Sequence, residues 1–212
     1  SDPWTCALSQ AILQAWFSPS YPVGAFSYSH GLEAAIAAGD VTDVETLSEW
    51  LTAVLREGGG RNDAILLAQR YRGAEVAELA SALAPSLERH LETWAQGRAF
   101  AAVTREVYGI ALEDAPYPVA VGAAAAALDL PLEEVLRYYL HAMLGNLVSA
   151  AVRFIPLGQT DGQRVLAGLF GQIAATADEA HSARLEDLGA MVPGADLAAM
   201  EHETLTTRIF RT

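Results

Sequence analysis

The 212-residue sequence contains no lysine, because all thirteen of its basic residues are arginine. Three kinds of site that need a lysine amine are therefore excluded: the lysine-containing phosphate-binding loop, the pyridoxal Schiff base and the kinase strand lysine. The 26 acidic residues give a net charge of -13, which repels phosphate backbones and anionic lipid surfaces. We therefore expect neither nucleic acid nor a membrane as a partner.

Cysteine is nearly absent as well, since Cys6 is the single one in the sequence. One cysteine cannot form an intrachain disulfide, and this fits a reducing compartment. No basic segment followed by an apolar run marks a signal peptide. The most apolar stretches, residues 120–128 and 140–155, are interrupted before the roughly 20 residues that a membrane span requires. We expect a soluble, cytoplasmic protein.

Alternating runs of β-branched residues flanked by hairpin turns are also missing, and apolar residues recur at helical spacing almost throughout. A composition that is 52% hydrophobic argues against disorder, and the length allows one large, well-buried core. No internal repeat or low-complexity linker separates a second domain. The sequence predicts an all-α fold in which residues 1–212 form a single domain, a compact bundle of roughly eight to ten helices whose last residues, about 205–212, form a C-terminal tail.

Capping residues and breaks set the expected helix boundaries. Thr42 and Glu45 stand in capping-box spacing, and Asn62 or Asp63 can cap the next helix. Thr160 and Gln163 also have capping-box spacing. The main helices are expected at residues 4–17, 27–38, from the Thr42 box to the glycines at 58–60, from about 62 to 72, from 85 to about 112, from 132 to 155 and from about 160 to 180.

The helix expected at residues 132–155 is the most apolar of the chain, with a broad apolar stripe and small residues on another side. A helix packed on two sides is a central helix. Arg153 near its end is either a partner for the helix dipole or a charge held at an interface. Similarly, Gln159 and Thr160 are either an exposed turn or a recognition corner, and the residues alone do not decide between these interpretations.

Residues 18–33, SPSYPVGAFSYSHGLE, combine Ser29 with His30 and invite comparison with a catalytic serine loop. The nucleophile elbow needs a glycine two positions before the serine and a preceding strand, and here Ser27 occupies that position and no strand is predicted. Neighbouring residues on a helix also point about 100° apart. We expect no catalytic residue. Ser27 is instead a candidate helix cap, and Tyr28, Ser29 and His30 form a candidate recognition edge.

The five histidines show no local metal-ligand spacing, so no metal site is predicted. His141 lies beside the apolar stripe and is interpreted as a hydrogen-bonded core or boundary residue. His202 stands between two glutamates, which an exposed charged tail explains without a metal. Asp63 is accounted for as a helix cap.

The C-terminal sequence TRIFRT places two large apolar residues, Ile209 and Phe210, between Arg208 and Arg211. Chain ends usually fray and carry small polar residues. A tail of this kind is either docked on its own domain or used to bind another protein, with Phe210 as the anchor.

Three segments together resemble the urease accessory protein UreF family: SPSYPVGAFSYSHGLE, GNLVSAAVRFIPLGQTDGQRVL and HETLTTRIFRT. They lie at the start, middle and end of the chain, in the family's order. The resemblance implies an all-α, non-enzymatic protein that forms a homodimer and joins a second accessory protein, UreD (also called UreH). That complex recruits the nickel-carrying GTPase UreG and delivers nickel to apo-urease, with no cofactor expected on this chain itself.

The resemblance also implies roles for individual residues. Asp63 resembles the acidic residue associated with control of the GTPase partner, and Arg153 stands where the family usually has lysine. The candidate recognition edge at residues 28–30 is expected on the same GTPase side. Gln159, with Gln163 beside it, is expected at the homodimer contact. The residues expected to dock on UreD are Arg208, Ile209, Phe210 and Arg211.

Two positions depart from the family pattern. Tyr117 occupies a position where relatives often carry histidine, which puts histidine-dependent metal handling there in doubt. Arginine in place of lysine at position 153 keeps the charge but changes the donor geometry. Two alternatives to the scaffold remain, a small all-α hydrolase with a Ser29 nucleophile and a plain nickel carrier.

Overall fold

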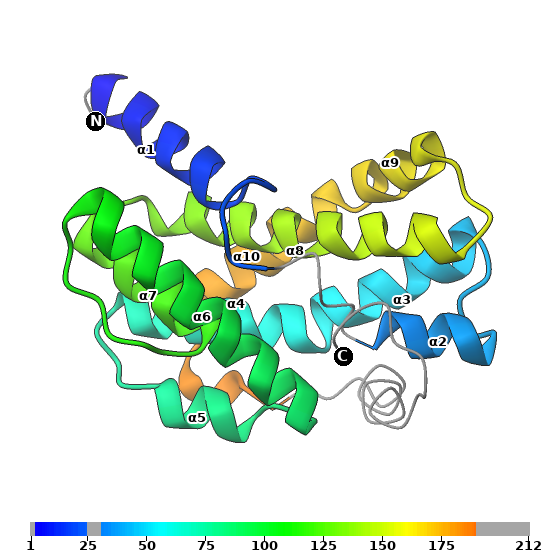
Figure 1. Cartoon of the computed structure of the whole chain (residues 1–212), viewed down its shortest axis with the longest axis horizontal. Coiled ribbons are helices and arrows are strands. Elements are labelled where there is room, and N and C mark those ends of the chain that lie inside the picture. The colour runs from blue at the N-terminus through cyan, green and yellow to red at the C-terminus, as the bar shows by residue number, and fades with distance from the viewer. Residues whose placement is uncertain (1–2, 25–30, 190–212) are drawn as a thin grey trace.

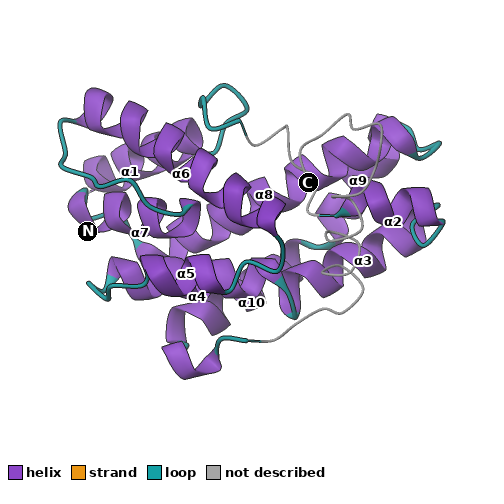
Figure 2. Ribbon diagram, turned by 60° about the horizontal axis from the view of Figure 1, so that its bottom comes forward, coloured by secondary structure: helices purple, strands orange, loops and turns teal. Residues whose placement is uncertain are grey.

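The computed structural model describes residues 3–24 and 31–189. This part of the chain folds into helices and contains no strand, which confirms the all-α prediction (Figures 1 and 2). The helices are α1 (Pro3–Trp16), α2 (Leu32–Ala38), α3 (Val44–Arg56), α4 (Gly59–Tyr71), α5 (Ala77–Ala82), α6 (Leu87–Tyr108), α7 (Tyr117–Ala127), α8 (Leu132–Phe154), α9 (Gln159–Gly168), α10 (Phe170–Ser182) and the short 3-10 helix η2 (Leu185–Asp187).

Helix α8 runs through the middle of the molecule, as predicted (Figure 1). It packs against α1, α2, α3, α4, α7, α9 and α10. Its buried stripe includes Leu136, Leu140 and Leu144, which are all fully removed from solvent. Burial of this stripe from several directions is what makes the helix stable, because removal of apolar surface from water is the main favourable contribution to folding. Among the residues described, none of the helices combines the length and the apolarity that a bilayer crossing requires.

Helix α7 joins α4 to α6 and was not placed by the sequence pattern, because its alanine-rich sequence has no apolar stripe. It packs closely against both of these helices. The contact with α4 depends on Gly122, since a Cβ atom there would lie 2.5 Å from the carbonyl oxygen of Leu67. Small side chains thus let the two helix backbones approach each other.

Several predicted boundaries at the N-terminal half need correction. The helix expected from residue 27 begins at Leu32 in the described chain, because Gly31 adopts a left-handed conformation with φ 79°. Its predicted end at Gly39 is confirmed, where φ is 86°. The capping box of α3 is formed by Asp43 and Thr46 instead of the predicted pair at 42 and 45: the Thr46 N–H donates to Asp43 Oδ1 at 2.9 Å, and the Asp43 N–H donates to Thr46 Oγ1 at 3.1 Å.

The prediction that Asn62 or Asp63 caps a helix is wrong, because α4 already begins at Gly59 and both residues lie inside it. The long helix expected to reach residue 112 ends at Tyr108, since Gly109 takes a left-handed φ of 64°.

The helix expected from 160 to 180 is divided into α9 and α10. The break falls at Leu169, a buried residue between two weak helix formers, Gly168 and Gly171. The capping box predicted at Thr160 and Gln163 is wrong as well, because α9 begins at Gln159 after Gly158, with no side-chain cap.

Residues 115–117 pack closely against α6 at Gly97. A Cβ atom on Gly97 would lie 1.8 Å from the carbonyl oxygen of Ala115 and 2.9 Å from the backbone nitrogen of Tyr117. Both neighbours are backbone atoms, so they cannot move aside as a flexible side chain would. Gly97 therefore fixes where α7 starts and where Tyr117 lies.

We predict that Gly97→Ala lowers the free energy of unfolding by about 3 kcal/mol or more, because the added methyl group forces the 115–117 backbone away from α6. Urea denaturation followed by circular dichroism measures this change. The matched control is Gly171→Ala in α10, where a Cβ atom would meet nothing within 4 Å. It should change stability by less than about 1 kcal/mol, and equal losses in the two variants would contradict the predicted contact.

Candidate functional site

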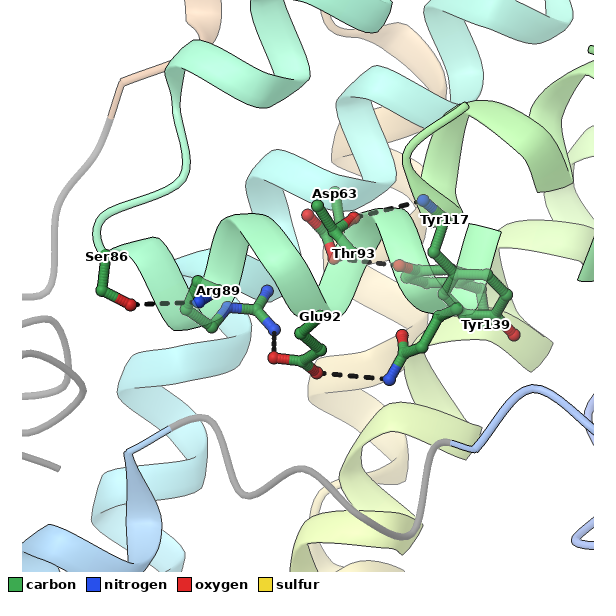
Figure 3. Close-up of polar contacts among 8 residues, drawn as sticks. Asp63, Ser86, Arg89, Glu92, Thr93, Tyr117 and Tyr139 are labelled. Atoms are coloured by element: carbon green, nitrogen blue, oxygen red, sulfur yellow. Dashed lines mark hydrogen bonds and ion pairs between the residues drawn. The ribbon is translucent and has the colours of Figure 1, made fainter. Parts of the chain in front are cut away.

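Helices α4, α6 and α8 and the start of α7 enclose a group of polar side chains in the interior (Figure 3). We call this group the polar cluster. Its members are Asp63, Arg89, Glu92, Thr93, Gln96, Tyr117 and Tyr139.

Helix α6 supplies four members of the polar cluster. Its first turn is capped by Ser86, whose Oγ accepts a hydrogen bond from the Arg89 N–H at 3.1 Å. Arg89 is followed three and four residues later by Glu92 and Thr93, and Gln96 comes one turn after these. This spacing places all four side chains on one face of the helix. Phe100 continues the same buried face, so α6 carries polar groups into the core next to an aromatic anchor.

Glu92 and Arg89 form an ion pair in which Arg89 Nη1 donates to Glu92 Oε2. Gln96 Nε2 donates to the other carboxylate oxygen of Glu92 at 3.3 Å. The Glu92 side chain is fully removed from solvent. Burial raises the pKa of Glu92 to about 6, and the neighbouring Arg89 guanidinium lowers it only in part. Glu92 therefore ionises in the folded protein at a higher pH than in the unfolded chain.

Asp63 is tied to α8 by Tyr139, whose hydroxyl donates to Asp63 Oδ2 at 2.9 Å. Burial raises the pKa of Asp63, while the charge of Arg89 and the Tyr139 hydrogen bond lower it in part. This contact links two helices that are far apart in sequence.

Tyr117 completes the polar cluster from α7. Its backbone N–H donates to Thr93 Oγ1 at 3.1 Å, and its ring centroid lies 5.4 Å from that of Tyr139 and 5.8 Å from that of Phe100. Burial raises the pKa of the Tyr117 phenol, so the hydroxyl stays neutral at physiological pH. The position therefore carries a packed, uncharged aromatic group.

Six members of the polar cluster, all except Glu92, line a cavity of about 40 Å³, which has room for a few water molecules. The polar cluster as a whole contains two carboxylates and one guanidinium group, so the ionised cluster is net negative. In the described part of the chain, no group of three or more histidine, cysteine or acidic side chains could hold a metal ion. The remaining wall of the cavity is formed by Phe17, Ala142, Met143 and Asn146.

The second predicted site lies at the corner where α8 ends and α9 begins. Arg153, Gln159 and Gln163 are all exposed there. Arg153 stands about 21 Å along α8 from Tyr139, at 1.5 Å per residue. The structure thus brings together the three predicted residues of the α8–α9 corner but does not bring Arg153 near Asp63, although both were predicted on the GTPase side.

The other predicted site residues lie outside the described part of the chain. These are the candidate cap Ser27, the recognition edge and the C-terminal tail. The residues of the edge and the tail are Tyr28, Ser29, His30, Arg208, Ile209, Phe210 and Arg211. His141 lies at the surface of α8, where its ring is 5.5 Å from that of Phe170 and partial burial lowers its pKa.

Sequence reasoning missed Arg89 and Glu92 and counted Tyr139 among the apolar residues of the central helix. A signal for the first two was present, since Glu92 and Gln96 occupy the same helix face as Phe100. Charged and amide side chains in a row with a core aromatic residue indicate a buried polar group that needs a partner. Tyr139 gave no such signal, because a tyrosine in an apolar stripe fits ordinary core packing.

The UreF family model matches residues 41–170, which is more than half of the chain. The chain belongs to the UreF family. The match covers the described polar cluster and the α8–α9 corner. A urease accessory protein UreF of Cereibacter sphaeroides is 52% identical over 97% of this chain and 100% of that protein. Proteins of the same name are 48% identical in Rhodopseudomonas palustris, over 98% of this chain and 95% of the relative, and 49% identical in Bradyrhizobium diazoefficiens, over 94% and 90%.

The raised pKa of Glu92 predicts a specific dependence of stability on pH in this UreF-family chain. Because the folded state holds the Glu92 proton more tightly than the unfolded state, this group stabilises the fold below pH 4.5 and the contribution is lost as the pH rises through about 6. Glu92→Gln removes the ionisation. The difference in unfolding free energy, variant minus wild type, should therefore rise by on the order of 1–2 kcal/mol between pH 4.5 and pH 7.

Urea denaturation at three or four pH values in this interval measures that difference. Glu133→Gln is the matched control, because Glu133 is an exposed residue of α8 paired with Arg137 at the surface. The difference between this variant and wild type is the baseline against which the Glu92→Gln difference is compared. If the difference in unfolding free energy between Glu92→Gln and wild type does not change with pH, the raised pKa of Glu92 is contradicted.

Proposed function

We propose that this chain is a cytoplasmic, non-enzymatic scaffold in urease maturation, which binds the accessory protein UreD and recruits the nickel-carrying GTPase UreG so that nickel reaches apo-urease. The observation that carries this proposal is the 52% identity to a urease accessory protein UreF over nearly the whole length of both chains. The motifs at residues 18–33, 145–166 and 202–212 support the same assignment. Nickel is cargo of the assembly and not a resident cofactor of this chain.

The chemistry of the polar cluster supports a scaffold better than an enzyme. Its carboxylates are engaged by side chains of the same molecule: Tyr139 donates to Asp63, and both Arg89 and Gln96 donate to Glu92. Groups held in this way join helices and shape a surface. A catalytic acid or base would instead have to reach a bound substrate in the cavity.

The exposed α8–α9 corner supports a binding role. Gln159 and Gln163 lie on the first two turns of α9 and are proposed to contact the second copy of the chain in a homodimer. Arg153 stands in the last turn of α8, where a cation is favoured by the helix dipole. Its planar guanidinium suits recognition of a carboxylate on the GTPase partner. Asp63 is proposed to act on the same partner from the polar cluster, and the tail residues 208–211 are proposed to dock on UreD.

We predict that Arg153→Ala weakens assembly with UreG about tenfold or more while leaving the melting temperature within about 2 °C of wild type. The reason is that a charged interface contact is costly to lose, whereas an exposed arginine contributes little to folding. Size-exclusion chromatography of the UreD–UreF–UreG mixture measures assembly, and differential scanning calorimetry measures stability.

Arg164→Ala in α9 is the matched control for this prediction. Arg164 is also exposed and pairs only within its own helix, with Asp161 at 2.8 Å, among the contacts of the described residues. Its loss should leave assembly unchanged. Normal assembly of the Arg153 variant together with a large loss of stability would return Arg153 to a structural role, and failure of the wild-type chain to join the two partners would contradict the scaffold itself.

A further inference from the structure

The hydroxyl of Tyr139 holds the Asp63 carboxylate in a fixed direction. Within the part of the chain that the structure describes, it is the one side chain that hydrogen-bonds this carboxylate, at 2.9 Å. The Tyr139 ring cannot turn freely. It packs edge-on against Phe17, with centroids 6.1 Å apart, and it lies at a tilt against Tyr117, with centroids 5.4 Å apart. A locked ring places its hydroxyl at one point, so Asp63 receives a donor from a defined position on α8.

The positive charge nearest to Asp63 is shared with a second carboxylate. Arg89 forms its ion pair with Glu92, which is fully buried and is also held by Gln96. Arg89 therefore acts on Asp63 through its positive charge, which lowers the pKa of Asp63. Removing the negative charge of Glu92 would remove its repulsion of the Asp63 carboxylate and leave the attraction of the Arg89 charge less offset, which favours the ionised form of Asp63.

From these two contacts we infer that Tyr139 and Glu92 are positioning residues for Asp63, which together set the direction and the charge of its carboxylate, and thereby its effect on the partner GTPase. This inference rests on the proposed function, in which Asp63 acts on GTP hydrolysis by that partner. It extends the control element from one residue on α4 to a network that spans α4, α6 and α8 (Figure 3).

The two positioning residues act in opposite senses. Tyr139 stabilises the ionised form of Asp63 by donating a hydrogen bond, while the negative charge of Glu92 repels that of Asp63 and offsets part of the attraction of Arg89. The ionisable groups that face Asp63 are Arg89 and Glu92 on α6, Tyr117 on α7 and Tyr139 on α8. Helices α3 and α10 also pack on α4, but they add no ionisable neighbour of Asp63 among the described residues.

The test measures GTP hydrolysis by the partner GTPase over the whole pH range in which the complex stays assembled. Each rate is divided by the rate of the Asp63→Asn complex at the same pH, which removes the GTPase's own pH dependence and leaves the transition due to Asp63. Tyr139→Phe should move the midpoint of this transition to higher pH, and Glu92→Gln should move it to lower pH, each by roughly 0.5–1 pH unit. A general weakening of the fold would not give shifts of opposite sign.

Tyr138→Phe is the matched control, because it removes the same hydroxyl from the adjacent residue of the same helix. The Tyr138 ring stacks on Phe17 at 6.4 Å and is placed outside the polar cluster. This variant should keep the wild-type midpoint. Melting temperatures of all variants establish that the complexes compared are folded, and if Tyr139→Phe does not fold, the direction of the Glu92→Gln shift decides the question.

The outcomes separate this inference from the function on which it rests. Shifts of opposite sign support it. If Asp63→Asn changes the rate but Tyr139→Phe and Glu92→Gln leave the midpoint in place, or move it in the same direction, the positioning role is overturned and Asp63 acts alone. If the Asp63→Asn complex is indistinguishable from wild type, the proposed role of Asp63 is wrong and the positioning role is wrong with it. A wild-type chain that does not assemble with the GTPase overturns the scaffold function.

Discussion

The fully buried carboxylate of Glu92 needs a partner, and its ion pair with Arg89 within helix α6 supplies one. A buried charge without a partner is strongly unfavourable, and removal of one member of a buried pair typically costs about 3–5 kcal/mol. Helix α6 therefore has to present both residues on one face, and Gln96 supplies a further donor one turn later. Asp63 and Tyr139 then join α4 and α8 to the same group of polar side chains.

Backbone packing brings these helices close enough for the contacts to form. Because Gly97 has no side chain, residues 115–117 can pack against α6. Gly122 in the same way lets α7 pack against α4. Because α7 is built mainly from alanine, it acts as a thin spacer between the two helices that carry Asp63 and Glu92. Tyr117 stands at its start and closes the polar cluster with an aromatic ring. The position of the polar cluster is thus a consequence of small residues outside it.

Much of the fold could be predicted from the sequence, and the reasons for the errors are physical. The central helix was predicted correctly because its apolar residues repeat with a helical period over more than six turns. The cap at Thr42 and the single helix at 160–180 were wrong. Capping spacing fits several neighbouring registers, and the weak helix formers Gly168 and Gly171 are tolerated inside many helices, so they do not by themselves predict a break. Helix α7 has no apolar stripe to detect, because nearly all of its side chains are small.

The candidate site was predictable only in part. Family motifs drew attention to Asp63 and to the exposed corner at Arg153, yet the sequence assigned Asp63 to a helix cap. Periodicity gives the angular position of a residue on its own helix and does not identify the helix that faces it. Tyr139 lies 76 residues from Asp63 along the chain, so their hydrogen bond follows from the packing of α4 on α8. That packing is a property of the whole fold.

The central claim is that Asp63 and Tyr139 act together inside one polar network. The most direct measurement is a double-mutant cycle in urea denaturation at pH 7, with Asp63→Ala, Tyr139→Phe and the double variant. A hydrogen bond to a buried carboxylate predicts that the two substitutions couple by about 1 kcal/mol or more, so that the second costs less once the first is made. Effects that add to within about 0.3 kcal/mol would contradict the network.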